Sequence, residues 1–284
     1  MNQTKQEARL ANPDIYWVVA DGTDAGKTTL AAALVSTLNR LGTPTIGFKP
    51  YSVAHFQLIF DFFSRYCARE PGFIIAPDGW QLMMASPLTR DFGASMVEAM
   101  VPVTVLSYPR WKDKFILRTG SVRLNNRELF ISDHTESLLK RNDFTRFHKE
   151  LALPFERATK LSMEEIAACV SMHEEKKQHA FGHLVNLGAQ AVVCEGASQL
   201  LPAWRGMPRV NHIFYISSGK LTFFPNLDIA TESMDWHGGV KIQELLKALA
   251  AKKAKGQAHP LYLATDENRD ATLEKILRTL LAHR

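Results

Sequence analysis

Residues 15–50, IYWVVADGTDAGKTTLAAALVSTLNRLGTPTIGFKP, contain the pattern that decides the fold. They begin with a short apolar run, 15–20, which is typical of a buried parallel strand. A glycine-bearing turn and a stretch with alanine and leucine at helical spacing follow, and Gly42 is a helix stop signal. Residues 43–50 form a second strand-like run that ends at a proline. A strand, a turn, a helix and a strand in this order predict a βαβ unit and therefore a parallel sheet.

The turn before the helix has the ending of a phosphate-binding loop. Backbone N–H groups at a helix N-terminus bind phosphate, a lysine there adds a positive charge, and a threonine hydroxyl can bind Mg²⁺. The Walker A pattern has a glycine five positions before the Gly-Lys-Thr ending, but Asp21 stands there and Gly22 comes one place late. We therefore predict a phosphate loop with an irregular first half. Its expected nucleotide-binding residues are Gly22, Thr23, Asp24, Ala25, Gly26, Lys27, Thr28 and Thr29.

Two further residues are expected to lie beside this loop. Glu195 follows the apolar run 191–194, and a buried strand of this kind can bring a carboxylate to the Mg²⁺ of a neighbouring phosphate loop. Mg²⁺ prefers one or two carboxylates together with phosphate oxygens and water. Lys49 ends the second strand of the βαβ unit, at the sheet edge where α/β proteins bind ligands. The sequence thus predicts Thr28 and Glu195 as Mg²⁺ ligands, and Lys49 as a functional residue beside Lys27 rather than a solvated lysine of a loop.

Size, charge and cysteine content limit the possible classes of protein. The chain has 284 residues, 46% of them hydrophobic, which suits one large domain or two small ones. A net charge of +5 suits anionic ligands such as nucleotides but is too weak by itself to indicate nucleic acid, which we do not expect as a partner. Three cysteines far apart in the sequence argue against a disulfide framework and for a reducing compartment. No apolar run approaches the roughly 18–20 residues that span a bilayer, so we expect a cytoplasmic protein without a membrane partner.

Strands alternate with helices near both ends of the chain, whereas the middle differs. Strands are also predicted at 101–108, 212–217 and 260–265, and an aromatic-rich helix at 53–67. The segment 114–133 alternates apolar and polar residues around Thr-Gly and Asn-Asn, which predicts β-hairpins. We expect a single α/β domain over residues 1–284, with a mainly parallel central sheet between two helical layers. A β-hairpin and helical element is expected to be inserted at about 107–160.

The opening segment resembles that of dethiobiotin synthetase, a family of P-loop NTPases. Gly22-Thr23-Asp24, Gly26-Lys27-Thr28 and Lys49-Pro50 match motifs of that family in order, although Ala25 stands alone where the family has a few residues. The segment that begins at Glu195, Glu-Gly-Ala, matches as well. The resemblance covers roughly 14–105 and 188–270, and it implies a P-loop NTPase fold.

The resemblance also implies an activity. Dethiobiotin synthetase is an ATP- and Mg²⁺-dependent cyclo-ligase of biotin biosynthesis, in which ATP activates a carbamate before ring closure. By resemblance, Lys27 and Lys49 are catalytic residues, and Lys49 would touch the phosphates or the reacting carboxylate. Asp78 is by resemblance a further Mg²⁺ ligand, although an aspartate before a predicted helix is also a common N-cap. Lys220 is similarly either near the phosphates or a lysine of a solvated loop. The expected partners are a nucleotide, a small-molecule substrate and a second copy of the chain in a homodimer.

The chain departs from the family at two places. Ser198-Gln199 stand where the family usually has glycines, and Thr265 stands where the family has an asparagine that binds adenine. The substrate and the base are therefore open.

Two other interpretations of the same loop stay open. One is a thymidylate-kinase-like small-molecule kinase, although the arginine-rich lid of such kinases has no compelling counterpart here. The other is a nucleotide-dependent switch or partner-binding ATPase, in which 107–160 would be the partner surface. Such switches usually carry an additional lysine early in the loop, and residues 21–25 contain none.

Two further patterns are interpreted as solvated surfaces. His179 and His183 lie four residues apart on a helix predicted at 163–188, but Ala180 stands where a zinc protease has glutamate. A basic stretch in the predicted hairpin region is interpreted in the same way rather than as a nucleic-acid surface. It contains Trp111, Lys112, Lys114, Phe115, Arg118 and Arg123.

Overall fold

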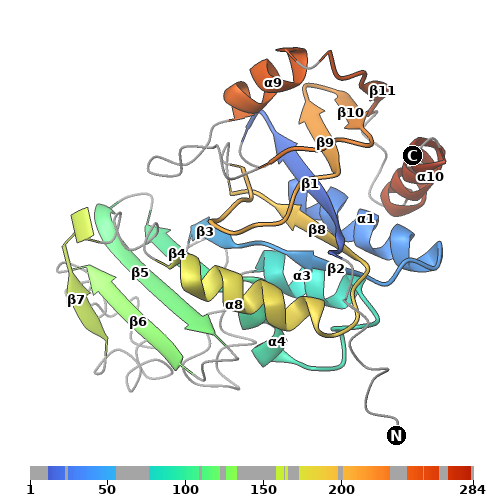
Figure 1. The fold of residues 1–284 in the computed structure, drawn as a ribbon. Coiled ribbons are helices and arrows are strands. Elements are labelled where there is room, and N and C mark those ends of the chain that lie inside the picture. Colours follow the sequence, from blue (N-terminus) through green and yellow to red (C-terminus); the bar gives the residue numbers. More distant parts are fainter. Residues whose placement is uncertain are drawn as a thin grey trace, which may run out of the picture.

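The structure of the chain is a computed structural model. It describes residues 12–22, 25–55, 77–108, 111–121, 126–132, 158–162, 164–165, 173–197, 201–230, 242–251, 253–261 and 268–282. Within these ranges the chain forms an α/β fold with two sheets and six helices (Figure 1). Thr23 and Asp24 of the predicted phosphate loop lie outside the described residues, as do Ser198-Gln199, Thr265 and residues 133–157 of the expected insertion.

The larger sheet has six strands in the order β11-β10-β9-β1-β8-β2. The four strands on one side are mutually parallel: β1 (Asp14–Ala20), β2 (Thr45–Phe48), β8 (Ala191–Glu195) and β9 (His212–Ser217). Except for Asp14, every residue of β1 is buried, as expected for a strand covered on both faces. The prediction of a mainly parallel central sheet is therefore confirmed.

Two antiparallel strands extend this sheet beyond β9. They are β10 (Lys220–Phe224) and β11 (Gln257–Pro260). The strand expected at 260–265 is thus found closer to the N-terminus, at Gln257–Pro260. Residues 262–267 are outside the described part. The strand β10 was not expected. It forms because the two-residue turn Ser218-Gly219, with Gly219 at φ 67°, reverses the chain directly after β9.

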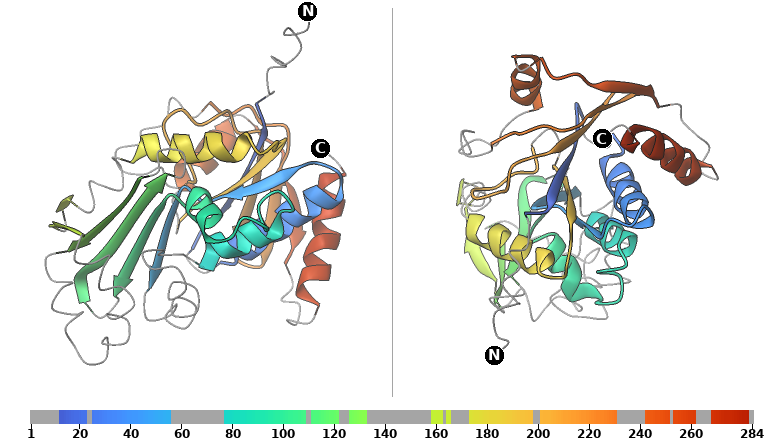
Figure 2. Two further views of the ribbon diagram at one scale, coloured as in Figure 1. Left: turned by 90° about the horizontal axis from the view of Figure 1, so that it is seen from below. Right: turned by 45° about the vertical axis from the view of Figure 1, so that its right-hand side comes forward.

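Helices cover both faces of the six-stranded sheet. In the right-hand view of Figure 2, α1 (Lys27–Arg40), α3 (Pro77–Ala85) and α10 (Arg269–Leu281) lie on one side. On the other side lie α8 (Glu174–Val185) and α9 (Ile242–Ala251). The buried face of α1 carries Leu30, Ala31, Leu34, Val35 and Leu38, which is the helical spacing read from the sequence. The expected arrangement of a sheet between two helical layers is confirmed.

The second sheet has five strands in the order β3-β4-β5-β6-β7. It comprises β3 (Tyr51–His55), β4 (Val103–Tyr108), β5 (Trp111–Ser121), β6 (Asn126–Ser132) and β7 (Thr159–Leu161). The predicted hairpin is present, because β5 and β6 pair antiparallel. The strand predicted at 101–108 is present as β4, and it pairs with β3 and β5. One expectation is wrong, because residues 51–55 are a strand where a helix was predicted from residue 53.

The chain passes from one sheet to the other at Lys49-Pro50. Proline has no N–H group, so Pro50 cannot continue the ladder of β2. The N–H of Lys49 instead donates to the carbonyl of Met100, at the end of α4 (Ala94–Met100). The expected insertion at 107–160 is therefore part of a sheet that already begins at Tyr51, directly after Lys49.

A close approach fixes α3 against β2. A Cβ atom added at Gly47 would come within 2.8 Å of Leu82 Cδ2, so only glycine fits at this point of β2. Leu82 and Phe48 are fully buried in the same core. This contact determines where the first turn of α3, with Asp78, lies relative to the end of β2.

No helix in the described part of the chain combines the length and the apolar character needed to cross a lipid bilayer.

Candidate functional site

The register of the parallel strands brings the predicted residues to one edge of the larger sheet. Val18 of β1 is level with Glu195 of β8, and Phe48 of β2 is level with Cys194. Lys49 is therefore next to Glu195, although 146 residues separate them in the sequence. The loop that leads from β1 to α1 leaves the sheet at the same edge.

The side chain of Lys27 connects the two ends of the loop between β1 and α1. Gly26, directly before the helix, has φ 77°, a left-handed conformation that favours glycine. The Lys27 ammonium donates to the carbonyl of Gly22 at 2.8 Å, so the side chain runs back along the loop. Lys27 is buried, whereas Gly22, Ala25 and Thr28 are half-buried. Gly22 and Gly26 thus delimit a short loop whose lysine reaches its opposite end.

Asp21, which stands where a Walker A loop has glycine, has a structural role outside this short loop. Its N–H donates to the carbonyl of Ile216 and continues the pairing of β1 with β9. Its carboxylate accepts a hydrogen bond from the Tyr215 hydroxyl. The loop proper therefore begins at Gly22, and Asp21 is the last residue that the sheet holds.

Four predicted residues form one hydrogen-bonded cluster. The Thr28 hydroxyl donates to Glu195 Oε1 at 2.8 Å, and the Lys49 ammonium donates to the same oxygen at 2.7 Å. Lys49 also donates to Asp78 Oδ2 at 2.5 Å. The four side chains come from α1, the end of β2, α3 and β8.

The cluster is buried, and one of its oxygens has no protein partner. The side chains of Lys49 and Glu195 are 6% and 1% exposed, whereas that of Asp78 is 28% exposed. Glu195 Oε2 is buried and accepts no hydrogen bond from the described residues. An unsatisfied buried carboxylate oxygen is costly, and such an atom often marks the place of an ion or a water molecule.

Burial and charge act in opposite directions on the two buried groups. Burial raises the pKa of Glu195, and the nearby Lys49 ammonium and the Thr28 hydroxyl oppose this rise. Burial alone would lower the pKa of Lys49, but Glu195 and Asp78 outweigh it and hold that pKa above its ordinary value. Lys49 is therefore a firmly charged ammonium between two acids.

Asp78 lies inside the first turn of α3 and not before the helix, since α3 begins at Pro77. An acid in the first turn is favoured by the helix dipole. Its carboxylate accepts from Lys49 and, at 3.4 Å, from the hydroxyl of Ser52. Ser52, a fully buried residue of β3, was not expected at the site. Its only signal in the sequence is its position three residues after Lys49.

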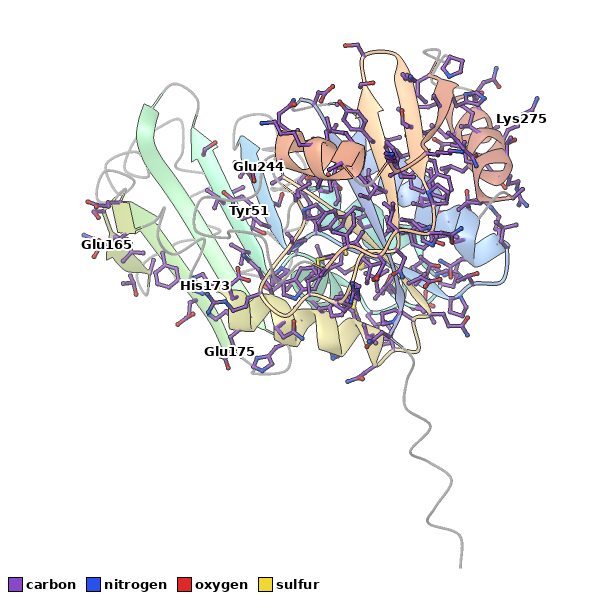
Figure 3. The ribbon with its side chains drawn as sticks, turned by 45° about the horizontal axis from the view of Figure 1, so that its top comes forward. Tyr51, Glu165, His173, Glu175, Glu244 and Lys275 are labelled. Atoms are coloured by element: carbon purple, nitrogen blue, oxygen red, sulfur yellow. The ribbon has the colours of Figure 1, made fainter. Side chains whose placement is uncertain are left out.

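Tyr51 begins the second sheet, two residues after Lys49, and Figure 3 shows it on β3, the edge strand of that sheet. Neighbouring residues of a strand point to opposite faces, so the Tyr51 side chain points away from the face on which Ser52 contacts Asp78. It packs against the buried Val103 and Val105. Burial raises the pKa of Tyr51 to about 12, so its hydroxyl stays protonated at neutral pH.

Two predicted residues lie outside the cluster. Thr29 lines a groove of about 510 Å³ between α1, α3 and α10, together with Trp80 and Arg269. Lys220 is exposed at the start of β10, at the same edge of the sheet as the loop, and none of the contacts of the described residues joins it to Thr28, Lys49 or Glu195.

The donor set of the cluster suits Mg²⁺ that is shared with a phosphate. Among the described residues no group of three or more His, Cys, Asp or Glu side chains gathers as in a closed metal site. Mg²⁺ needs only one or two carboxylates when phosphate oxygens and water complete its shell. Asp78, Glu195 with its unpartnered oxygen, and Thr28 fit that requirement. His179 lies apart on α8, 3.9 Å from Glu175.

Comparisons of the chain with protein-family models, with curated proteins and with solved structures find no match.

Proposed function

We propose that this chain is an ATP- and Mg²⁺-dependent P-loop enzyme. The observation that carries the proposal is the convergence of the Thr28 hydroxyl and the Lys49 ammonium on one oxygen of the buried Glu195, beside the N-terminus of α1. A helix start with a lysine favours phosphate, and two carboxylates with a hydroxyl favour Mg²⁺. Both features occur at one edge of the sheet, which is where open α/β folds bind ligands.

Each residue has a distinct role in this proposal. The N–H groups at the start of α1 and the Lys27 ammonium bind the terminal phosphates. Thr28, Glu195 and Asp78 hold the Mg²⁺ ion, which neutralises charge on the phosphates when it is bound. Lys49 neutralises charge on the transferred phosphoryl group or on the acceptor. Phosphoryl transfer depends mainly on such positioning and charge neutralisation.

The reaction class that we propose is ATP-driven activation of a carboxylate or carbamate, followed by attack of an amine. It rests on the resemblance of the segments around Gly22, Lys49 and Glu195 to dethiobiotin synthetase. The position of Lys49 supports it, because an ammonium that already binds two carboxylates in this structure suits an anionic acceptor. We propose a homodimer on the resemblance alone.

A nucleotide-dependent switch is the second candidate. Its supporting observation is the short connection at Lys49-Pro50, which links the site directly to β3 and the second sheet. A change in the position of Lys49 on nucleotide binding would act on that sheet. In this case the surface of the second sheet would bind a protein partner.

Phosphate release distinguishes these functions. The synthetase proposal predicts phosphate release from ATP that requires both diaminopelargonic acid and bicarbonate. Release stimulated only by a macromolecule would support the switch, and transfer to a nucleoside monophosphate would support a kinase. Absence of both phosphate release and phosphoryl transfer under all three conditions would contradict an enzymatic role.

The binding role of Lys27 can be tested separately. Saturating Mg²⁺-ATP should raise the melting temperature of the native protein, since a ligand at one hundred times its Kd stabilises by about 2.7 kcal/mol. We expect Lys27→Ala to lose this shift, because the variant lacks the charge that faces the phosphates. Lys247→Ala, at an exposed position of α9, is the control and should keep the shift. An equal shift in Lys27→Ala would refute the assigned loop.

A further inference from the structure

The Lys49 ammonium occupies the place between two proposed metal ligands. It lies 2.5 Å from Asp78 Oδ2 and 2.7 Å from Glu195 Oε1. A Mg²⁺ ion bound to both carboxylates would lie about 2.0–2.1 Å from one oxygen of each. The ammonium and the metal would thus compete for the space between the two carboxylates.

Electrostatics also makes the two cations exclude one another. Like charges a few ångström apart repel strongly, and burial leaves little water to screen them. Conversely, two carboxylates that both contact one small volume need a cation, since otherwise one of them takes up a proton. The site therefore holds one cation at a time between Asp78 and Glu195.

The Lys49 ammonium can move while its backbone stays in place, provided that another cation takes over the two carboxylates. Its backbone is held by the hydrogen bond to Met100, while the ammonium is at the end of a flexible four-carbon chain. The loop with Lys27 and the start of α1 lie beside it, through Thr28 and Glu195. A phosphate bound there would offer the ammonium a new anionic partner within reach.

We infer that Lys49 is a built-in substitute for the metal ion. Without nucleotide it keeps Asp78 and Glu195 paired and excludes free divalent cations. When a metal–triphosphate complex arrives, the metal takes the two carboxylates and the ammonium moves to the phosphates or to the acceptor. The metal therefore enters only together with the nucleotide, and the two carboxylates have a cation between them in both states. This inference rests on the proposed function.

Manganese binding tests the inference without an activity measurement. Mn²⁺ replaces Mg²⁺, and the relaxation of water protons reports Mn²⁺ that is held by the protein. The native protein should bind Mn²⁺ tightly with the non-hydrolysable analogue AMP-PNP and only weakly without it. Lys49→Met removes the competing charge, and we expect it to bind free Mn²⁺ about 5- to 150-fold more tightly than the native protein, the usual range for coupling between two bound ligands.

Three controls locate the effect. Lys247→Met, on the exposed face of α9, should behave like the native protein. Adding Glu195→Gln to Lys49→Met should abolish the gained binding, because it removes a carboxylate ligand. If Lys49→Met does not fold, Lys49→Gln serves instead, since its amide can still donate to one carboxylate while carrying no charge.

The outcomes separate this inference from the function on which it rests. If the native protein binds Mn²⁺ with AMP-PNP but binds free Mn²⁺ as tightly as Lys49→Met does, the inference is wrong and the proposed function stands. If the native protein holds no Mn²⁺ even with AMP-PNP, the proposed function fails, and the inference fails with it.

Discussion

The carboxylate of Glu195 is buried, and hydrogen-bond donors contact one of its two oxygens. Thr28 and Lys49 satisfy one of its oxygens, while the other has no partner among the described residues. Burial of a charge without a partner costs several kcal/mol, so removal of one member of such a pair is strongly destabilising. The stability of this site therefore depends on Lys49.

The pH dependence of a Lys49→Met variant should show this dependence. Burial raises the pKa of Glu195 above 4.5, and Lys49 opposes that rise in the native protein. A carboxyl whose pKa is raised on folding stabilises the fold at pH below its unfolded pKa, and this contribution is lost as the pH rises through the folded pKa. Without Lys49 the pKa of Glu195 rises further, so the variant should lose more stability than the native protein between about pH 5 and about pH 8.

Urea denaturation of both proteins at the two pH values measures the effect. We expect the variant to be destabilised at both, and more at the higher pH. The pKa of Lys49 itself is raised above 10.5, so its own titration lies above this range. An equal destabilisation at both pH values would show that Lys49 does not act on the ionisation of Glu195.

Sequence patterns predict most of these residues because each carries a local signal. Lys27 and Thr28 belong to a motif between a strand and a helix, and Lys49 and Glu195 each end an apolar run. Ser52 and the pair of Asp21 and Tyr215 could not be predicted in this way. Their positions result from strand pairing across the fold, which no local pattern records.

At the scale of elements, the contact between β2 and α3 sets the distance from Lys49 to Asp78. Gly47 precedes Lys49 by two residues, and Leu82 follows Asp78 by one helical turn. A methyl group at Gly47 would overlap Leu82, whose Cδ2, Cβ and Cγ lie 2.8–3.1 Å from the added Cβ. Any substitution here should push α3 away from the sheet.

Gly47→Ala should destabilise the protein by about 1–3 kcal/mol, the usual cost of overpacking. Gly182→Ala is the matched control, because an added Cβ at this position of α8 meets nothing within 4 Å. Alanine is favoured over glycine inside a helix by about 0.5–1 kcal/mol, so this variant should be slightly more stable. Denaturation midpoints of the two variants check both signs, and an unchanged midpoint for Gly47→Ala would contradict the close approach.

The elements that sequence analysis predicts correctly have a strong periodic signal. The segment 27–40 has helical spacing, and β1 and β8 are uninterrupted apolar runs. Residues 51–55 lack a comparable signal, because a five-residue strand followed by aromatic residues also fits a helix. For β10, Ser218-Gly219 directly after a predicted strand indicates a hairpin turn. The resemblance instead interprets the segment that follows as a loop.

At the scale of the whole molecule, the two sheets are joined through β2 and β3, which follow one another in the chain (Figure 1). The connection between these strands is Lys49-Pro50. A second contact joins the second sheet to a helix that covers the larger sheet. It is the ion pair of Lys176, on α8, with Glu128, on β6. The hairpin was predicted, but its membership of a sheet with β3 and β4 was not. Which strands share a sheet is decided by contacts between distant segments, and a sequence pattern gives only the strands.

Both sheets contribute to the site. The larger sheet, with α1 and α3, provides Thr28, Lys49, Asp78 and Glu195. The second sheet provides Ser52, whose hydroxyl donates to Asp78.

A crystal structure with Mn²⁺ and AMP-PNP tests the central claim most directly, because the anomalous signal of manganese locates the metal independently of the protein atoms. We predict one strong peak in contact with the Thr28 hydroxyl, the Glu195 carboxylate and oxygens of the β- and γ-phosphates, with Lys27 on the same phosphates. A nucleotide bound away from the start of α1, or a manganese peak that Thr28 and Glu195 do not touch, would contradict the account.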